Sequence, residues 1–253
     1  MLPALKAFNA QIIMETDRRL IPLLHRSYPE ISFIPEMETA GIMKLFPAIQ
    51  SQISSGDLGG IFRRERKDFP AQNTYFAADT NNTERIRSKN HLEPDARIIG
   101  LSWKSRNLQF GADKSLALID FLPVVDQFRD VVFVSLQYGD VSQEVKDFEA
   151  ATGRRIRLLQ GVDLFASMED LASAISLCTE VVTCSNVTAH MACALGKDTK
   201  VLLPEGVGRI WYWGADGEST PWYPTARLFR QHATGDWNGV IADVKQALTT
   251  LTT

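Results

Sequence analysis

Short apolar runs recur along the chain, and longer segments with apolar residues at helical spacing separate them. The short runs predict strands at 11–15, 31–34, 97–103, 131–136, 156–159, 181–184, 201–203 and 228–230. The longer segments predict helices at 4–10, 17–27, 83–91, 114–128, 142–152, 168–177, 188–195 and 237–248. Strands that alternate with helices favour parallel sheets with helical crossovers. The expected fold is therefore α/β, with two Rossmann-like doubly wound parallel-sheet domains facing each other.

A domain boundary is expected near residue 94, because 92–96 (LEPDA) has the composition of a linker. The two domains are then 1–94 and 95–253. The first is the less regular one, since 36–75 shows no sustained periodicity. Most of the regular pattern therefore belongs to the second domain.

Charge and composition narrow the class of protein. The 253 residues carry 27 basic and 30 acidic side chains, a net charge of -3, so nothing indicates a general nucleic-acid or membrane surface. A local basic cluster does follow the glycine-rich segment 54–60, and its members are Arg63, Arg64, Arg66 and Lys67. Such clusters usually form a solvated face, although the glycine-rich segment before it leaves contact with an anion open.

The chain has the features of a cytoplasmic protein. No apolar stretch approaches the roughly 20 residues of a membrane helix, and the first residues make a poor signal peptide. Cys178, Cys184 and Cys193 are odd in number, lack zinc spacing and lie in apolar contexts. We expect all three to be reduced and buried.

The segment 180–197 (EVVTCSNVTAHMACALGK) is the most informative run of the sequence. It predicts a buried strand, a polar turn and a helix of small residues that Gly196 ends. Ser185, Asn186 and Thr188 have the short oxygen-bearing side chains that cap helices. A helix that begins just past a strand directs N–H groups into the cleft there, which suits a phosphate or diphosphate.

Four loops of the second half follow predicted strand ends: 104–106, 137–139, 185–190 and 204–213. Because the carboxyl ends of parallel strands lie along one edge of a sheet, these loops should share one cleft. They bring together cations, a helix terminus, a planar amide and an aromatic ring. This combination fits a nucleotide diphosphate better than a free carboxylate.

His190 is the obvious acid–base candidate of this cleft, and the alternative is a packing or capping histidine. At a helix N-terminus we expect the neutral imidazole. The aromatic loop that contains Trp211, Trp213, Trp222 and Tyr223 suits either a wall for a sugar ring or the core. The sequence shows no metal-ligand cluster, so a metal-dependent transferase is disfavoured, and it has neither GxSxG nor a P-loop.

Several motifs occur in a characteristic order: IGLSWKS at 99–105, FVSLQYGD at 133–140, SNVTAHMACALGK at 185–197, and PWYPTARLFRQ with GDW within 221–237. Together they resemble the C-terminal half of GT-B-fold glycosyltransferases related to bacterial heptosyltransferases (glycosyltransferase family nine). The variety usually found behind tetratricopeptide repeats is the most similar, and protein O-GlcNAc transferases are similar too. The resemblance covers 96–248 well and 3–80 more weakly.

The resemblance implies two Rossmann-like domains, the second of which binds a nucleotide sugar without a metal or a further cofactor. The residues it implies around the donor phosphates, the base, the diphosphate and the sugar are, in that order, Lys104 and Ser105; Gln137 and Tyr138; Asn186, Thr188, Ala189 and His190; Arg209 and Trp211. No catalytic residue is assigned.

The family's first domain begins with a strand and a Gly-Asp-containing loop that help to place the acceptor and the base. This chain starts after that point, so we expect a truncated first domain, either as a fragment or by loss of the element. Glu15 and Asp57 are available carboxylates, and neither is assigned as the base.

The leading hypothesis is a bacterial, metal-independent, inverting glycosyltransferase of the hexosyl- or heptosyltransferase type. A catalytically inactive binding or scaffold module is the alternative, and a nucleotide-sugar epimerase is a third. The expected partners are a nucleotide sugar and a glycan, lipid-linked or protein acceptor, with no nucleic acid. An exposed edge of a truncated sheet would also favour a homodimer.

Overall fold

The structure is a computed structural model that describes residues 2–36, 41, 44, 47 and 49–249. It has two compact units, Met1–Gln72 and Asn73–Thr253. The boundary expected near residue 94 differs from this division, because α4 (Thr80–Lys89) packs against α7 (Met168–Leu177) within the second unit. The segment before residue 94 thus includes a helix of the second unit.

The first unit contains a parallel β-α-β element, as the sequence predicts. The strands β1 (Ile13–Thr16) and β2 (Ser32–Pro35) pair in parallel, and α1 (Ile21–Ser27) connects them. Leu23 and Leu24 of this helix are buried. The other described elements of this unit are η1 (Leu2–Phe8), α3 (Leu58–Phe62) and η2 (Arg66–Asp68). Part of the irregular segment 36–75 lies outside the described residues.

The start of α1 differs from the prediction that Asp17 caps a helix over 17–27. The Asp17 carboxylate instead accepts hydrogen bonds from the backbone and the guanidinium of Arg19, at 2.7 to 3.1 Å. Pro22 explains the later start, because proline lacks an N–H and fits only the first turn of a helix. The helix therefore begins at Ile21.

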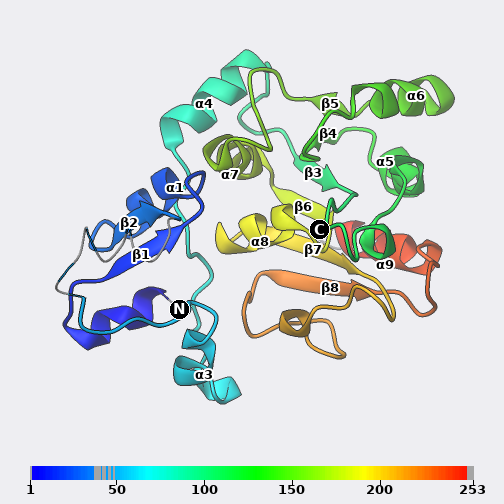
Figure 1. The fold of residues 1–253 in the computed structure, drawn as a ribbon. Helices are drawn as coiled ribbons and strands as arrows, with labels where there is room; N and C mark the ends of the chain where they lie inside the picture. Colours follow the sequence, from blue (N-terminus) through cyan, green and yellow to red (C-terminus); the bar gives the residue numbers. More distant parts are fainter. Residues whose placement is uncertain (1, 37–40, 42–43, 45–46, 48, 250–253) are drawn as a thin grey trace. The chain divides into compact units, whose positions relative to one another are not determined.

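The second unit is built on a six-stranded parallel sheet with the order β5-β4-β3-β6-β7-β8. Its strands are β3 (Ile98–Ser102), β4 (Val132–Ser135), β5 (Arg157–Leu158), β6 (Glu180–Cys184), β7 (Asp198–Leu203) and β8 (Ala226–Arg230). Every residue of the central strands β3 and β6 is buried, which is typical of a parallel sheet covered on both faces. The doubly wound α/β architecture predicted for this part of the chain is confirmed (Figure 1).

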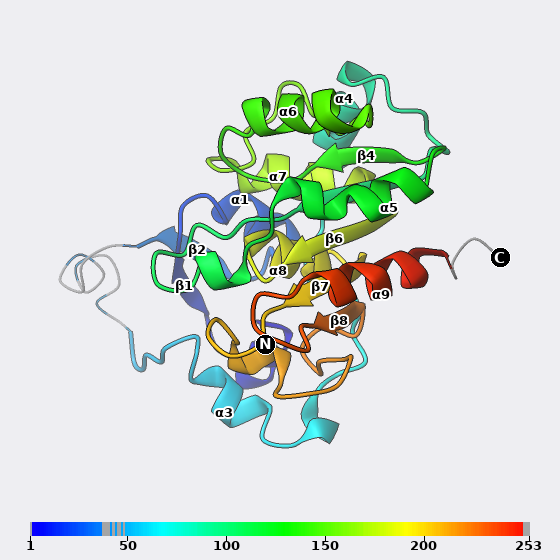
Figure 2. The ribbon, with the colours of Figure 1, turned by 90° about the vertical axis from the view of Figure 1, so that its right-hand side faces the viewer.

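Helices cover both faces of this sheet. Figure 2 shows α5 (Leu122–Gln127), α6 (Ser142–Thr152) and α9 (Asn238–Thr249) in front of the strands, with α7 and α8 (Val187–Ala194) behind. The front layer packs its apolar side chains on the sheet in one core, whereas Ala189 and Cys193 of α8 join a second core on the other face. The three cysteines are free and buried, as predicted. The two helix layers thus cover the faces of the sheet, and the loops of the candidate site lie at the strand ends.

The helix predicted over 114–128 is broken into three short pieces. These are the 3₁₀ turns η3 (Ala112–Lys114) and η4 (Leu118–Phe121), followed by α5. The interruption lies at 115–117, where Ser115 and Ala117 are extended and the Leu116 N–H donates to the Trp103 carbonyl at 2.8 Å. Pro123 lies in the first turn of α5, where its missing N–H costs nothing. The break allows the chain after β3 to fold back over the edge of the sheet.

None of the described helices has the length and apolar character needed to cross a membrane.

A buried group of charges joins the amino ends of the strands. The Glu180 carboxylate contacts Arg97 through Oε1 at 2.6 Å and Lys200 through Oε2 at 2.7 Å. Lys200 also pairs with Asp198 at 2.8 Å, and its side chain is only 3% exposed. Burial of an ion is costly unless partners satisfy it, and here the charges of β6, of β7 and of the residue before β3 neutralise one another.

Replacing Lys200 by Met should lower the free energy of unfolding by about 3 kcal/mol, because the buried Glu180 carboxylate loses one of its two cationic partners. Urea unfolding followed by circular dichroism measures the change. Lys146→Met, on the exposed surface of α6, is the control and should change the free energy by less than about 0.5 kcal/mol. A loss below about 1 kcal/mol in the Lys200 variant would contradict this role.

Candidate functional site

Two buried amide side chains tie together the loops that follow β3, β4 and β6. The Gln137 Oε1 atom accepts hydrogen bonds from the backbone N–H groups of Trp103 and Lys104, at 2.9 and 2.8 Å, and from the Ser102 hydroxyl at 3.2 Å. The Asn186 amide donates to the same Ser102 hydroxyl at 2.8 Å and to the Lys104 carbonyl at 3.1 Å. The structure therefore brings these sequence-predicted residues together, with Gln137 and Asn186 forming an internal clamp.

Asn186 is also the N-cap of α8, as its sequence context predicts. Its Oδ1 atom accepts from the N–H groups of Thr188 at 2.9 Å and Ala189 at 3.3 Å. Two of the amides expected to hold a phosphate thus already have a partner. The Thr188 hydroxyl is fully buried without a hydrogen-bond partner among the described residues, so an unsatisfied polar group remains in the first turn.

Lys104 is turned toward α6 and is neutralised. Its ammonium lies 2.7 Å from Glu144, whose other oxygen accepts from the Trp103 indole at 3.1 Å. Both ions line an open groove of about 510 Å³ between α6 and η4. The other residues of this groove are Ala117, Leu118, Ile119, Asp147, Phe148 and Ala151. This ion pair reduces the charge that Lys104 can offer to a phosphate.

Lys114 is a candidate that the sequence did not single out. Its side chain is buried, at 6% exposure, and within the described parts of the chain no hydrogen bond or ion pair satisfies its ammonium. Burial lowers the pKa of Lys114, and its charge acts on both Cys184 and His190. It lies at the end of η3, and the only sequence signal was a lysine at the start of a predicted helix.

A glycine leaves room for this lysine. Gly208, in the loop after β7, has a φ of +88°, and a Cβ atom there would lie 2.9 Å from Cγ of Lys114. Both the left-handed backbone and the close approach favour glycine. The loops after β3 and β7 therefore meet around the stem of Lys114.

His190 lies in an aromatic box beside Lys114. Its ring stacks on Trp213 with centroids 5.1 Å apart and approaches Tyr212 edge-on at 4.7 Å, while Nδ1 is 3.2 Å from the Tyr223 hydroxyl. Burial, and secondarily the Lys114 charge, lowers the pKa of His190 to about 4. The imidazole is neutral at pH 7, as expected from the sequence, but the main cause is desolvation.

The aromatic loop after β7 contains one buried and one exposed tryptophan. Trp213 is buried, and its indole N–H donates to the Ser185 hydroxyl at 2.9 Å, so it belongs to the core. Trp211 is 75% exposed and meets Trp222 edge-on at 5.7 Å. Arg209 lies 3.1 Å from Glu205, which neutralises its charge. The exposed Trp211 is therefore the member of this loop best placed to meet a ligand.

A second aromatic group lies at the ends of β3, β4 and β5. The Tyr138 hydroxyl accepts from the Arg106 N–H at 3.0 Å, and the neighbouring Ser105 N–H donates to Ser115 at 3.0 Å. Phe165, in the loop after β5, is 51% exposed and lies 6.3 Å from the Tyr138 ring. Phe165 was not among the predicted site residues, because its proximity to Tyr138 arises only from the sheet order.

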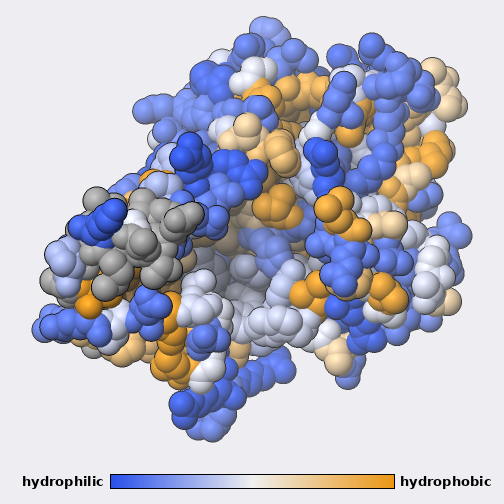
Figure 3. Space-filling view, viewed as in Figure 1, coloured by the Kyte–Doolittle hydropathy of each residue, from blue (hydrophilic) through white to orange (hydrophobic). Residues whose placement is uncertain are grey.

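Exposed apolar side chains gather at the same edge. Among the described residues of the second unit, the exposed large hydrophobic side chains lie in connections that follow strand carboxyl ends: Leu108, Ile119, Phe165, Val187, Val207 and Trp211. In the view of Figure 3, apolar patches of this unit lie among polar ones. Exposed apolar groups beside a few polar side chains are typical of a ligand-binding edge. No group of three or more metal-ligating side chains occurs among the described residues.

Comparisons with known proteins agree with this fold. No protein-family model matches the chain. It is 27% identical over 245 residues to Protein FlbA of Caulobacter vibrioides, which covers 93% of this chain and 40% of FlbA. The chain thus spans less than half the length of this curated relative.

Two solved structures are similar over nearly the whole chain. The E. coli ADP-heptose lps heptosyltransferase II has a TM-score of 0.68 at 14% identity, covering 99% of this chain and 94% of that one. The glycosyl transferase family 9 structure from Veillonella parvula has a TM-score of 0.65 at 13% identity, covering 98% and 92%. The chain therefore has the GT-B-like fold of heptosyltransferases. The expected kinship with tetratricopeptide-repeat members and O-GlcNAc transferases, and the expected truncation, stay predictions.

The lowered pKa of His190 predicts acid-sensitive stability. Between pH 6.5 and about 4 the unfolded histidine binds a proton that the folded one does not, so stability is fully present above pH 6.5 and is lost as the pH falls toward 4. One such proton gives a slope of up to about 1.4 kcal/mol per pH unit. His190→Phe should remove this contribution, as measured by urea unfolding from pH 7 to 4.5.

The exposed His232 supplies the control, because it lies outside the aromatic box. His232→Phe should retain the pH dependence of the unsubstituted protein. Equal slopes for the His190 variant and the unsubstituted protein would show that His190 titrates normally in the folded state.

Proposed function

We propose that the chain binds a nucleotide sugar at the carboxyl edge of the six-stranded sheet and transfers the sugar to an acceptor, as a glycosyltransferase. The observation that carries the proposal is Lys114, whose side chain is largely buried, whose ammonium has no partner among the described residues, and whose charge acts on His190 in the first turn of α8. Burial disfavours the charged form of this lysine and lowers the pKa of Lys114, and an anionic ligand would offset that cost.

Two further features of the site favour a phosphate. The positive end of the α8 dipole lies at Val187 and Thr188, and the unpartnered Thr188 hydroxyl can donate a hydrogen bond. One or two phosphate groups of a nucleotide sugar match this set of donors, whereas an uncharged sugar alone does not.

The proposed reaction is a single displacement. The acceptor nucleophile forms a bond to the anomeric carbon while the bond from that carbon to the phosphate oxygen breaks, so the nucleoside diphosphate leaves with the electron pair and the acceptor proton passes to a base. Lys114 and the α8 terminus would stabilise the negative charge that develops on the leaving phosphate. One displacement inverts the anomeric configuration, and these groups supply the electrostatic role without a metal.

The comparisons support the proposal at the level of fold. The similar structures are named as a heptosyltransferase and as a member of glycosyltransferase family 9. Fold alone does not define activity, so the proposal depends on the site. The proposed partners are a nucleotide sugar as donor and a glycan, a lipid-linked saccharide or a protein as acceptor.

A non-catalytic binding module is the second candidate. The pairing of Lys104 with Glu144 and of Arg209 with Glu205 favours it, because only part of the positive charge at this edge is free to act on a leaving group. Incubation of the purified chain with nucleotide sugars and EDTA separates the two. Released nucleoside diphosphate supports the transferase, whereas binding without release supports the module.

Replacing Lys114 by Met should weaken nucleotide binding at least about tenfold, because a charge-assisted contact to phosphate is lost. A thermal-shift screen against UDP, GDP, ADP, CMP and their sugar conjugates measures it. A ligand at 100 times its dissociation constant should stabilise the unsubstituted protein by about 2.7 kcal/mol, or several degrees. Without ligand, the variant should be as stable as the unsubstituted protein or more stable, since it loses a charge that burial disfavours.

Lys104→Met is the matched control and should retain the nucleotide response, because Glu144 already neutralises that lysine. Loss of the response in the Lys104 variant and retention in the Lys114 variant would reverse the assignment of the two lysines. No response of the unsubstituted protein to any nucleotide would contradict the proposed function.

A further inference from the structure

We propose that Phe165, flanked by Arg106 and Tyr138, is the surface on which the donor nucleobase stacks, and that Asp170 positions it. This inference rests on the proposed function, since it concerns the half of the same donor that Lys114 does not contact. It places the base on a residue outside the set predicted from the sequence.

The three side chains form one platform. The Arg106 guanidinium lies 5.4 Å from the centroid of the Phe165 ring, and the centroid of the Tyr138 ring lies 6.3 Å from the same point. The Tyr138 side chain is buried. Phe165 nevertheless leaves half of its surface exposed. A half-exposed aromatic ring beside a guanidinium is the combination on which planar bases stack.

Gln137 is less suited to read the base. Its amide oxygen already accepts three hydrogen bonds, and its amide nitrogen donates to the carbonyls of Lys104 and Tyr138 at 3.2 and 3.3 Å. Because both its oxygen and its nitrogen already make hydrogen bonds within the protein, Gln137 belongs to the clamp. Phe165 therefore takes the role of contacting the base.

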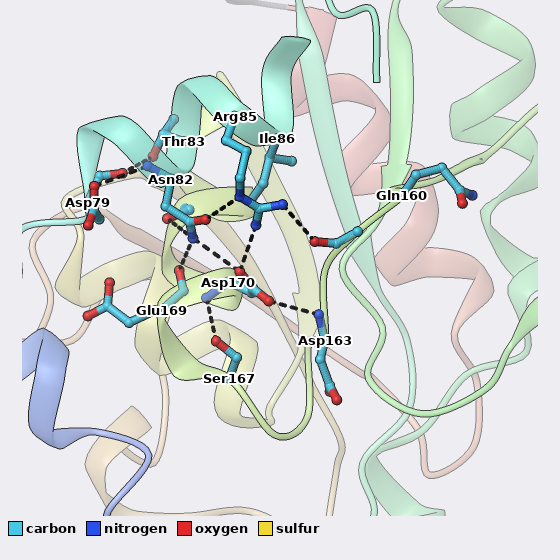
Figure 4. A network of polar contacts seen from close by, with 12 residues as sticks. Asp79, Asn82, Thr83, Arg85, Ile86, Gln160, Asp163, Ser167, Glu169 and Asp170 are labelled. Atoms are coloured by element: carbon cyan, nitrogen blue, oxygen red, sulfur yellow. Dashed lines mark hydrogen bonds and ion pairs between the residues drawn. The ribbon is translucent and has the colours of Figure 1, made fainter. Parts of the chain in front are cut away.

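Hydrogen bonds from aspartate side chains to backbone N–H groups hold the loop that carries Phe165. The Asp163 carboxylate accepts from the N–H groups of Phe165 at 2.9 Å and Ala166 at 2.8 Å. The Asp163 N–H in turn donates to Oδ2 of Asp170 at 3.0 Å (Figure 4). These contacts fix the backbone on both sides of the aromatic ring.

Asp170 connects this loop to two helices. Its Oδ1 atom accepts from Asn82 at 3.1 Å and from Arg85 at 3.2 Å, both on α4, while its own N–H donates to Ser167 at the start of α7. Arg85 also donates to the Gly161 carbonyl at 3.0 Å, so it binds the other end of the loop. Figure 4 shows Asp170 at the centre of these contacts.

This arrangement makes the platform rigid before any ligand arrives. A preorganised aromatic ring loses little conformational entropy on binding, so its stacking is expressed as affinity. Stacking of one base on an aromatic ring corresponds to roughly five- to 150-fold in affinity when the ring is replaced by alanine. Asp170 acts through Phe165 and is therefore a positioning residue.

The test compares ligands with and without a base on the full chain. Isothermal titration calorimetry gives dissociation constants for UDP, CDP, ADP, GDP and inorganic pyrophosphate. Phe165→Ala should weaken the preferred nucleoside diphosphate about tenfold or more and leave pyrophosphate within twofold. Phe165→Trp should restore the affinity, because the larger ring retains a stacking face.

Asp170→Asn should weaken the nucleotide several-fold and reduce the preference among bases, again without an effect on pyrophosphate. Glu169→Gln is the control on the same helical turn, since its carboxylate points away from Arg85 in Figure 4, and it should leave every constant unchanged. An effect of Asp170→Asn on pyrophosphate and nucleotides alike would show a merely structural role and overturn the positioning role.

Unchanged nucleotide affinity in Phe165→Ala would overturn the stacking role while the proposed function stands. Weakening of pyrophosphate in Lys114→Met but not in Phe165→Ala would separate the phosphate half of the site from the base half. If the unsubstituted protein binds neither nucleotides nor pyrophosphate, the proposed function fails and this inference fails with it.

Discussion

The clamp formed by Gln137 and Asn186 is the constraint on which the arrangement of the site depends. A buried amide is costly unless its oxygen and nitrogen are satisfied, and here each amide is satisfied by groups from other strand ends. These hydrogen bonds therefore fix the path along which the loop after β3 leaves the sheet. That path leads to Lys114, and the same Asn186 fixes the first turn of α8. Removal of the Asn186 amide would therefore release the loop after β3 and the first turn of α8 together.

Much of the fold could be predicted from the sequence because it depends on local pattern. Buried parallel strands such as β6 read as apolar runs, and the Asn186 cap follows from its position before a helix. The helix predicted over 114–128 failed because Leu116 makes a backbone hydrogen bond to Trp103, so the chain is extended at 115–117. Asp17 failed as a cap because a nearby arginine competes for its carboxylate. Local signals thus located the elements, while competing side chains decided their ends.

The candidate site was less predictable, because pairing between distant residues decides what each charge can do. Lys104 looked suitable for a phosphate until Glu144, 40 positions later, neutralised it. Lys114 looked ordinary, and only its tertiary surroundings make it buried and unpartnered. Phe165 approaches Tyr138 because β4 and β5 are neighbours in the sheet. The strand order decides which side chains meet at this edge of the sheet, whereas the sequence motifs indicate only which loops lie there.

Gly208 couples two parts of the chain that are far apart in sequence. Its lack of a side chain leaves the space in which the stem of Lys114 lies. A side chain at position 208 would therefore displace Lys114, although every candidate site residue would be unchanged in the sequence. A related sequence with such a change would lose the proposed contact of Lys114 and would still contain every motif of the candidate site. The geometry of the candidate site thus depends partly on a residue outside the motifs that define it.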